Sequence, residues 1–78
     1  MQEYKIKLNS IREVKEFVGF ANNYAFDIDL VSGRYAVDGK SIMGIFSLDL
    51  SKILTMRVHS GSREGKEFAE DVAKFIVD

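Results

Sequence analysis

The sequence predicts an α+β fold, in which a four-stranded antiparallel sheet carries helices on one face. Short segments in which apolar and charged residues alternate indicate strands with one buried face. Segments in which apolar residues recur every three or four positions indicate amphipathic helices between these strands. The segments follow one another in the order βαββαβα without a linker or repeat, so residues 1–78 are expected to form one domain.

The first strand and the first helix have the clearest patterns. Tyr4, Ile6 and Leu8 alternate with lysines and predict a strand. The stretch Ser10-Ile-Arg-Glu13 is typical of a capping box, in which the Ser10 hydroxyl accepts from the Glu13 amide and the Glu13 side chain accepts from the Ser10 amide. Apolar residues at helical spacing then predict an amphipathic helix over roughly residues 11–22, with its buried stripe at Ile11, Val14, Phe17, Val18 and Ala21.

The second and third strands are expected to form a hairpin. Phe26, Ile28 and Leu30 alternate with two aspartates, and the chain returns through Tyr35 and Val37. The intervening Ser32-Gly33 is a tight-turn signal.

The second half of the chain predicts a short helix, a fourth strand and a last helix. Asp38-Gly39 ends the hairpin, and Ser41 begins a short helix with apolar residues Ile42, Met43, Ile45, Phe46 and Leu48. Residues 53–59 alternate as a strand. A turn over residues 60–64 leads into a helix with the apolar stripe Phe68, Ala69, Val72, Phe75 and Ile76.

Composition excludes several classes of function. The net charge of −1 argues against binding to nucleic acid, which depends on a strong positive charge. No apolar run approaches the about 20 residues that span a bilayer, and no apolar signal segment opens the chain. One histidine and no cysteine leave no metal site or catalytic triad in view, and no cofactor or small-molecule substrate is indicated. We therefore expect a soluble, cytoplasmic protein.

The chain resembles HPr, the phosphocarrier of the bacterial phosphotransferase system. Lys40-Ser-Ile-Met-Gly-Ile45 and Ser47-Leu48, within the segment 38–48, resemble the second helix of that family. Ser32–Val37 resembles its hairpin, and the element order matches its open-faced β-sandwich. The resemblance covers nearly the whole chain, but only segment 38–48 is specific, and the connector 49–52 is shorter than usual and lacks a glycine.

The sequence departs from this family at the start of the first helix. The family pattern there is His, any residue, Arg, Pro, and the matching residues here are Ser10, Ile11, Arg12 and Glu13. A phosphoimidazole passes its phosphoryl group onward readily, whereas a serine phosphate ester is too stable to be a good donor. We therefore expect no catalytic residue and no relay of phosphate, so the protein is not expected to be an enzyme.

The same residues still offer a weakened anion-binding site. The helix N-terminus at residues 10–13 offers free amides, and the guanidinium of Arg12 can clamp an anion, so Ser10, Ile11 and Arg12 are the candidate anion-binding residues. Glu13 adds a negative charge to that site. The alternatives are that Ser10 only caps the helix and that Arg12 is only a solvated first-turn residue.

The resemblance further implies a regulatory serine and a docking surface in the second helix. Ser41 matches the serine that a dedicated kinase phosphorylates, and the alternative is a second helix cap. Ile42, Met43 and Phe46 match the docking positions, provided that Ile45 and Leu48 point inward; the alternative is that they belong to the core. The partners implied are enzyme I, enzyme IIA, HPr kinase or a transcription regulator.

These observations predict a protein-binding or regulatory domain. One alternative is a protein switched by phosphorylation of Ser41, another is a phosphocarrier that uses an unexpected group, and a third is an unrelated binding role on the same scaffold. His59 is the only histidine, but its strand is expected to run antiparallel to the first strand. Its end then lies about 17–20 Å from residue 10, which is too far for it to replace the missing imidazole.

Overall fold

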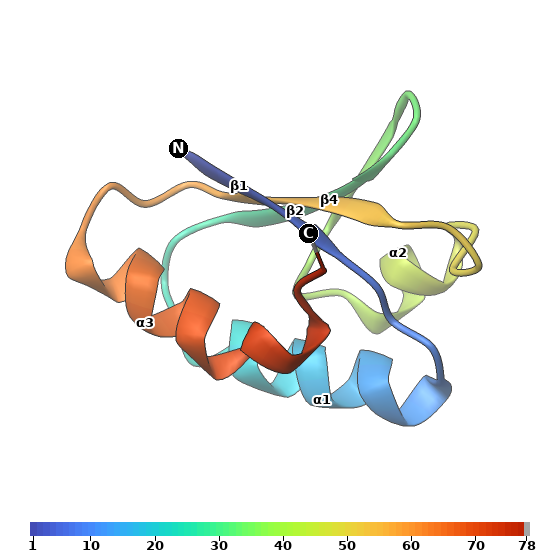
Figure 1. Cartoon of the computed structure of the whole chain (residues 1–78), viewed down its shortest axis with the longest axis horizontal. Coiled ribbons are helices and arrows are strands. Elements are labelled where there is room, and N and C mark those ends of the chain that lie inside the picture. The colour runs from blue at the N-terminus through green and yellow to red at the C-terminus, as the bar shows by residue number, and fades with distance from the viewer. Residues whose placement is uncertain (78) are drawn as a thin grey trace.

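The sheet contains all four strands in one antiparallel array, with the order β1-β4-β2-β3. The computed structural model describes residues 1–77. The strands are β1 (Gln2–Ile6), β2 (Ile28–Ser32), β3 (Tyr35–Asp38) and β4 (Leu54–Val58). The helices α1 (Ile11–Ala21), α2 (Ile42–Phe46) and α3 (Arg63–Asp71), with the short 3-10 helix η1 (Ala73–Phe75), lie together on one side of the sheet (Figure 1). The predicted α+β open-faced sandwich is thereby confirmed.

The core fills the space between the sheet and the helices. The inward residues of the strands alternate as the sequence predicts, so that Leu54, Met56 and Val58 are all buried in β4. Phe17 of α1 and Phe68 of α3 are fully buried beneath them, with ring centroids 5.9 Å apart in an edge-to-face arrangement. This contact fixes α1 against α3 under the sheet.

The two edges of the sheet differ. At β1, residues 75–77 pair with the strand or its continuation: Lys7 N donates to Phe75 O at 2.9 Å, Val77 N donates to Lys5 O at 2.7 Å, and Ile76 forms a bridge with Ile6. At the opposite edge, β3 has β2 as its only partner strand among residues 1–77. The sheet therefore has one covered edge and one open edge.

Four elements have boundaries that differ from the prediction. The last helix was expected to continue through Phe75 and Ile76, but α3 ends at Asp71. The chain leaves the helix there because the Phe75 side chain is buried in the core and Ile76 pairs with Ile6 of β1. The first strand ends at Ile6, although Leu8 is still buried, and β4 is one residue shorter at each end than predicted. The second strand begins at Ile28, because Phe26 leaves the sheet and packs 6.2 Å from the Phe68 ring.

The helices of the described residues are short. The longest helix, α1, has 11 residues, and in the described part of the chain no helix has the length and apolar character to cross a bilayer.

Candidate functional site

The start of α1 is organised by the side chain of Ser10. This residue has an extended backbone, and its Oγ accepts a hydrogen bond from Glu13 N at 3.1 Å. Glu13 Oε1 accepts from Asn9 N at 2.7 Å, so the predicted capping box reaches back to Asn9 and not to the Ser10 amide. The first bond of the helical ladder runs from Val14 N to Ser10 O at 3.1 Å. The amides of Ile11 and Arg12 precede this bond and so have no partner within the helix.

Two hollows meet at Ser10. One has a volume of about 410 Å³ and is lined by the charged residues Arg12, Glu13, Glu16 and Lys74 together with Ser10 and Phe75. The other has a volume of about 400 Å³ and is lined mainly by apolar side chains and the first loop, namely Lys7, Leu8, Asn9, Ser10, Ile11, Phe46, Leu50 and Ser51. Ser10 thus lies between a charged surface and an apolar one.

The charged hollow is close to electrically balanced. Lys74 Nζ donates to Glu16 Oε2 at 2.8 Å, and this hydrogen bond, with the positive charges of Lys74 and Arg12, lowers the pKa of Glu16. Glu16 is therefore ionised at neutral pH, and it offsets the charge of Lys74. Glu13 and Arg12 line the same hollow. Two carboxylates and two cations leave little net attraction for an anion.

The apolar hollow joins α1 to the segment that follows α2. Ile11 was expected to belong to the buried stripe of α1, but its side chain is 63% exposed and lies in this hollow with Phe46 and Leu50. Lys7 Nζ donates to Asn9 Oδ1 at 3.0 Å and to Leu50 O at 2.8 Å, which ties the first loop to the connector after α2. The contact between Lys7 and Leu50 has no sequence signal, because the two residues are 43 positions apart.

The short helix α2 presents two of its apolar side chains to solvent. Ser41 caps the helix, and its Oγ accepts from Gly44 N at 3.0 Å. Ile45 and Leu48 are buried, whereas Met43 and Phe46 are 79% and 39% exposed.

Of the predicted docking residues, Ile42 is half-buried and packs against the core. Phe46 lines the same hollow as Ser10 and Ile11, whereas Ser41, Ile42 and Met43 line neither hollow at Ser10.

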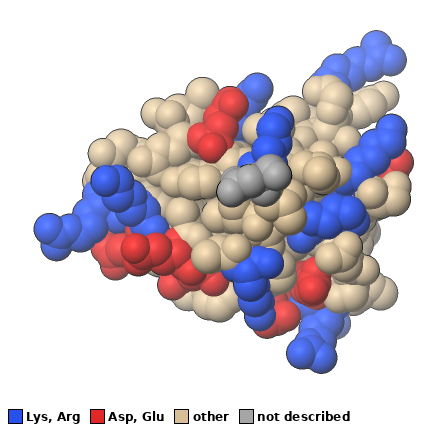
Figure 2. Space-filling model, viewed as in Figure 1, with Lys and Arg blue, Asp and Glu red and all other residues tan. Residues whose placement is uncertain are grey.

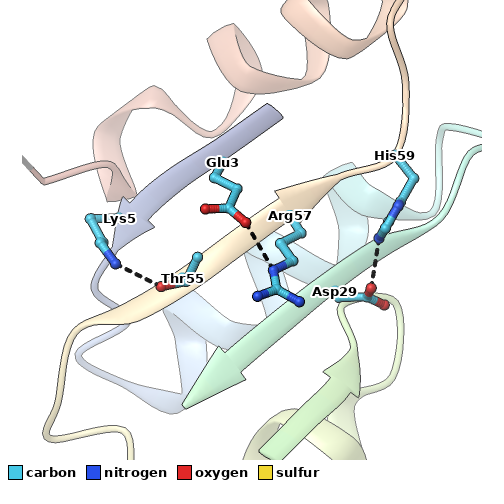
Figure 3. A network of polar contacts seen from close by, with 6 residues as sticks. All are labelled: Glu3, Lys5, Asp29, Thr55, Arg57 and His59. Atoms are coloured by element: carbon cyan, nitrogen blue, oxygen red, sulfur yellow. Dashed lines mark hydrogen bonds and ion pairs between the residues drawn. The ribbon is translucent and has the colours of Figure 1, made fainter. Parts of the chain in front are cut away.

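His59 lies on the face of the sheet that the helices leave open. Figure 3 shows its ring directed at Asp29, with His59 Nε2 2.7 Å from Asp29 Oδ2. The same face carries the Arg57–Glu3 ion pair at 3.0 Å. His59 follows the β4 residue that pairs with Gln2 at the start of β1, whereas Ser10 follows the other end of β1. The structure does not bring His59 to the start of α1.

Charge and metal-binding capacity are both modest. Figure 2 shows basic and acidic side chains interspersed over the visible face, consistent with a net charge of −1. Within residues 1–77 no three histidine, aspartate or glutamate side chains are grouped so that they could hold a metal ion.

Comparison with known proteins gives a consistent result. A family model described as the PTS HPr component phosphorylation site matches residues 9–78. The phosphocarrier protein HPr of Bacillus anthracis is 26% identical, with a TM-score of 0.72 over 97% of this chain and 96% of that one. HPr-C-His of Thermoanaerobacter tengcongensis is 24% identical, with a TM-score of 0.76 over 95% and 92% of the two chains.

A third similar structure is that of Crh, the Bacillus subtilis catabolite repression containing protein, which forms a dimer by domain swapping. It is 25% identical, with a TM-score of 0.66 over 94% of this chain and 88% of that one. Among proteins of curated function, none matches the sequence at a significant level.

Proposed function

The chain belongs to the HPr family of phosphotransferase-system components, and from that premise we propose that it binds proteins of this system without relaying phosphate through a histidine. The observation that carries the proposal is Ser10, the N-cap residue directly before α1, at the position where the family pattern has its histidine. The hydroxyl oxygen of Ser10 already accepts a bond from the Glu13 amide. A phosphoryl group on that oxygen would displace the cap and would form an ester too stable to pass onward.

The surroundings of Ser10 also favour binding over phosphoryl transfer. Glu13 and Glu16 offset the positive charges of Arg12 and Lys74 in the charged hollow. Ser10, Ile11 and Arg12 then form at most a weak anion site. His59, the only imidazole in the chain, lies beyond the other end of β1 and pairs with Asp29.

The partner would dock on α2. We call Ile42, Met43 and Phe46 the α2 surface. It includes Met43, the most exposed large apolar side chain of the described residues, and the partly exposed Phe46, and the exposed Ile11 lines the apolar hollow with Phe46. Exposed methionine and aromatic side chains are enriched at interfaces because they bury a large area and adapt to the partner. Enzyme I, enzyme IIA, HPr kinase or a transcription regulator of the cytoplasm are the partners that fit this family.

The first experiment tests the loss of relay. The protein is incubated with phosphoenolpyruvate and enzyme I, beside HPr of Bacillus anthracis as a positive control. We expect an acid-labile phosphoprotein from the control only. Labelling of the wild-type chain would overturn the proposal, and loss of that label in the His59→Ala variant would identify the unexpected acceptor.

The second experiment tests the docking surface. Binding to immobilised enzyme I and to HPr kinase is measured for the wild type, for Met43→Glu and Phe46→Glu, and for Ala25→Glu as the control. Ala25 is exposed in the segment between α1 and β2 and lines none of the described hollows. We expect the two α2 variants to lose binding by about tenfold or more, since a charge at an apolar contact must be desolvated. Equal effects of all three variants would contradict docking on α2.

Regulation through Ser41 is the second candidate. Ser41 precedes Ile42 and Met43 directly, so a phosphate on its oxygen would add charge at the edge of the α2 surface. It would also replace the Gly44 hydrogen bond of the cap. With HPr kinase and ATP, this candidate predicts an acid-stable phosphoserine that is absent from Ser41→Ala. An unmodified wild-type chain, under conditions that label Bacillus anthracis HPr, would exclude it.

A further inference from the structure

We propose that the open edge of the sheet at the β2–β3 hairpin binds an extended acidic segment of a partner protein. This surface is separate from the α2 surface, and the inference does not depend on the proposed function. It follows from a groove beside the hairpin, from the charges that line it and from the unpaired edge strand that borders it.

The groove lies between the hairpin turn and the connector that leads into β4. It has a volume of about 520 Å³, the largest of the three hollows described for residues 1–77, and is lined by Ser32, Gly33, Arg34, Tyr35, Ser47, Leu48, Asp49, Lys52 and Ile53. Gly33 has a φ of +60°, which lets the two-residue turn form and places Arg34 at the mouth of the groove. Figure 1 shows the turn of the hairpin projecting away from the helices.

The groove is lined by apolar and by positively charged side chains. Leu48 is nearly buried, while Tyr35 and Ile53 are 64% and 59% exposed. Arg34 and Lys52 have no carboxylate partner within the described residues, and the guanidinium of Arg34 lies 5.9 Å from the centre of the Tyr35 ring. Two unpaired cations beside exposed apolar side chains fit a ligand that carries a carboxylate next to an apolar group.

The only acidic residue that lines the groove, Asp49, is already hydrogen-bonded to Ser51. Asp49 Oδ1 accepts from Ser51 Oγ at 2.6 Å and from Ser51 N at 3.1 Å. These bonds, with the positive charges of Lys52 and Lys7, lower the pKa of Asp49 and keep it ionised, so the lining carries a net charge of one positive unit at neutral pH. Asp49 is hydrogen-bonded within its own loop and makes no ion pair with Arg34 or Lys52 among the described residues.

The edge strand favours an extended peptide as the occupant. The Ser32–Tyr35 pair closes the turn, so the next residue, Ala36, directs its backbone N–H and C=O away from β2. Ala36 is exposed and small, and nothing within residues 1–77 adds a strand there, whereas the β1 edge is covered by residues 75–77. A peptide that pairs with Ala36 continues past Tyr35 into the groove, where its acidic side chain meets Arg34 and Lys52.

The test is a titration of the full chain, followed by the chemical shifts of its backbone amides. The probe is the capped peptide Thr-Val-Thr-Glu-Phe-Thr-Val, and the control peptides carry Gln or Lys in place of Glu. We expect shifts confined to the hairpin and to residues 47–53, with a Kd of about 1 mM or tighter for the Glu peptide. Absence of these shifts, or equal binding of the Lys peptide, would overturn the proposal.

Matched variants separate the two parts of the contact. Arg34→Glu with Lys52→Glu should weaken binding by about tenfold, while the exposed cations Lys15 and Arg63, reversed as controls, should not. Ala36→Pro removes the outward N–H at an edge position that tolerates proline, and it should also weaken binding, whereas Ala36→Thr should not. Unchanged affinity in both test variants would contradict the proposal.

Two further outcomes distinguish the occupant. Inorganic phosphate should not displace the peptide at equal concentration, because it lacks the strand pairing. Displacement by phosphate would identify a site for small anions and would overturn a peptide site. Met43→Glu on the α2 surface should leave peptide binding unchanged, so that failure of this inference and failure of the proposed function are measured separately.

Discussion

The sequence predicted that Ser10 caps the first helix. Only the resemblance to the HPr family gives the same residue a chemical meaning, because that family has a histidine at this position. Its oxygen accepts from Glu13 N, as the capping box indicated, since a cap depends on residues only three positions apart. The exposure of Ile11 was not predictable, because helical spacing alone places it on the same stripe as the buried Val14 and Val18. Its neighbours in the apolar hollow, Phe46 and Leu50, come from a distant segment.

Replacement of Ser10 by alanine should reduce the free energy of unfolding by about 1 kcal/mol, because the amide of Glu13 loses its acceptor. Ser10→Asn keeps an acceptor at the same position and should be close to the wild type. Urea denaturation of the three proteins measures the difference. Equal midpoints for Ser10→Ala and the wild type would show that the cap contributes nothing.

The phenol of Tyr24 should lose its proton at a higher pH than an ordinary tyrosine. Its hydroxyl donates to Asp71 Oδ2 at 2.6 Å, and this bond, with partial burial and the negative charge of Asp71, raises its pKa from 10.0 to about 12. Because the folded-state pKa is raised, the resulting stabilisation is fully present below pH 10 and is lost as the pH rises through about 12. In an ultraviolet titration, Asp71→Asn should move this phenol toward its ordinary pKa. An unchanged curve in Asp71→Asn would contradict the assignment.

The elements themselves were predictable in type and order, and their ends were less so. Asp38-Gly39 was predicted to end the hairpin, and β3 ends at Asp38. The structure adds a close contact between the residue after β3 and the start of β2: Gly39 N donates to Ile28 O at 2.7 Å. A side chain at Gly39 would place its Cβ 2.9 Å from Ile28 Cγ2. This contact sets the path of the chain into Ser41 and α2, and so positions the α2 surface.

Gly39→Ala should therefore lower the free energy of unfolding by about 1–3 kcal/mol through overpacking against Ile28. Gly61→Ala is the matched control, since a Cβ at Gly61 meets no atom within 4 Å. Thermal and urea unfolding of both variants tests the difference. Comparable losses in the two variants would indicate a general effect of glycine replacement and not this contact.

The whole molecule depends on one aromatic cluster between the helices and the sheet. Phe68 lies within edge-to-face distance of Phe17, Tyr24 and Phe26, with centroid separations of 5.9, 5.4 and 6.2 Å. It joins α3 to α1 and to the segment before β2. A chain of 78 residues has a small core, because small domains bury a smaller fraction of their surface on folding. The four rings therefore make up a large part of that core.

Phe68→Ala should cost about 3–5 kcal/mol, a large part of the about 5–15 kcal/mol typical of a folded domain. Met43→Ala, at a side chain that is 79% exposed, should change the free energy of unfolding by no more than about 0.5 kcal/mol. Chemical denaturation of the two variants measures both values. A small loss in Phe68→Ala would show that the neighbouring rings close the cavity.

The sequence by itself determined the order of the elements, the caps at Ser10 and Ser41 and the inward faces of the strands. These features depend on residues within one turn of a helix or two positions of a strand, where periodicity and side-chain chemistry act directly. The sequence also shows directly that residue 10 is a serine and not a histidine.

Only the tertiary structure decided which segments meet. The pairing of Ile76 with Ile6, the Lys7 bond to Leu50 O and the contact of His59 with Asp29 each join residues at least 30 positions apart. Such contacts follow from how the sheet and helices pack, which no local pattern encodes. They cover one edge of the sheet with residues 75–77, and no described residue adds a strand to β3 at the other edge.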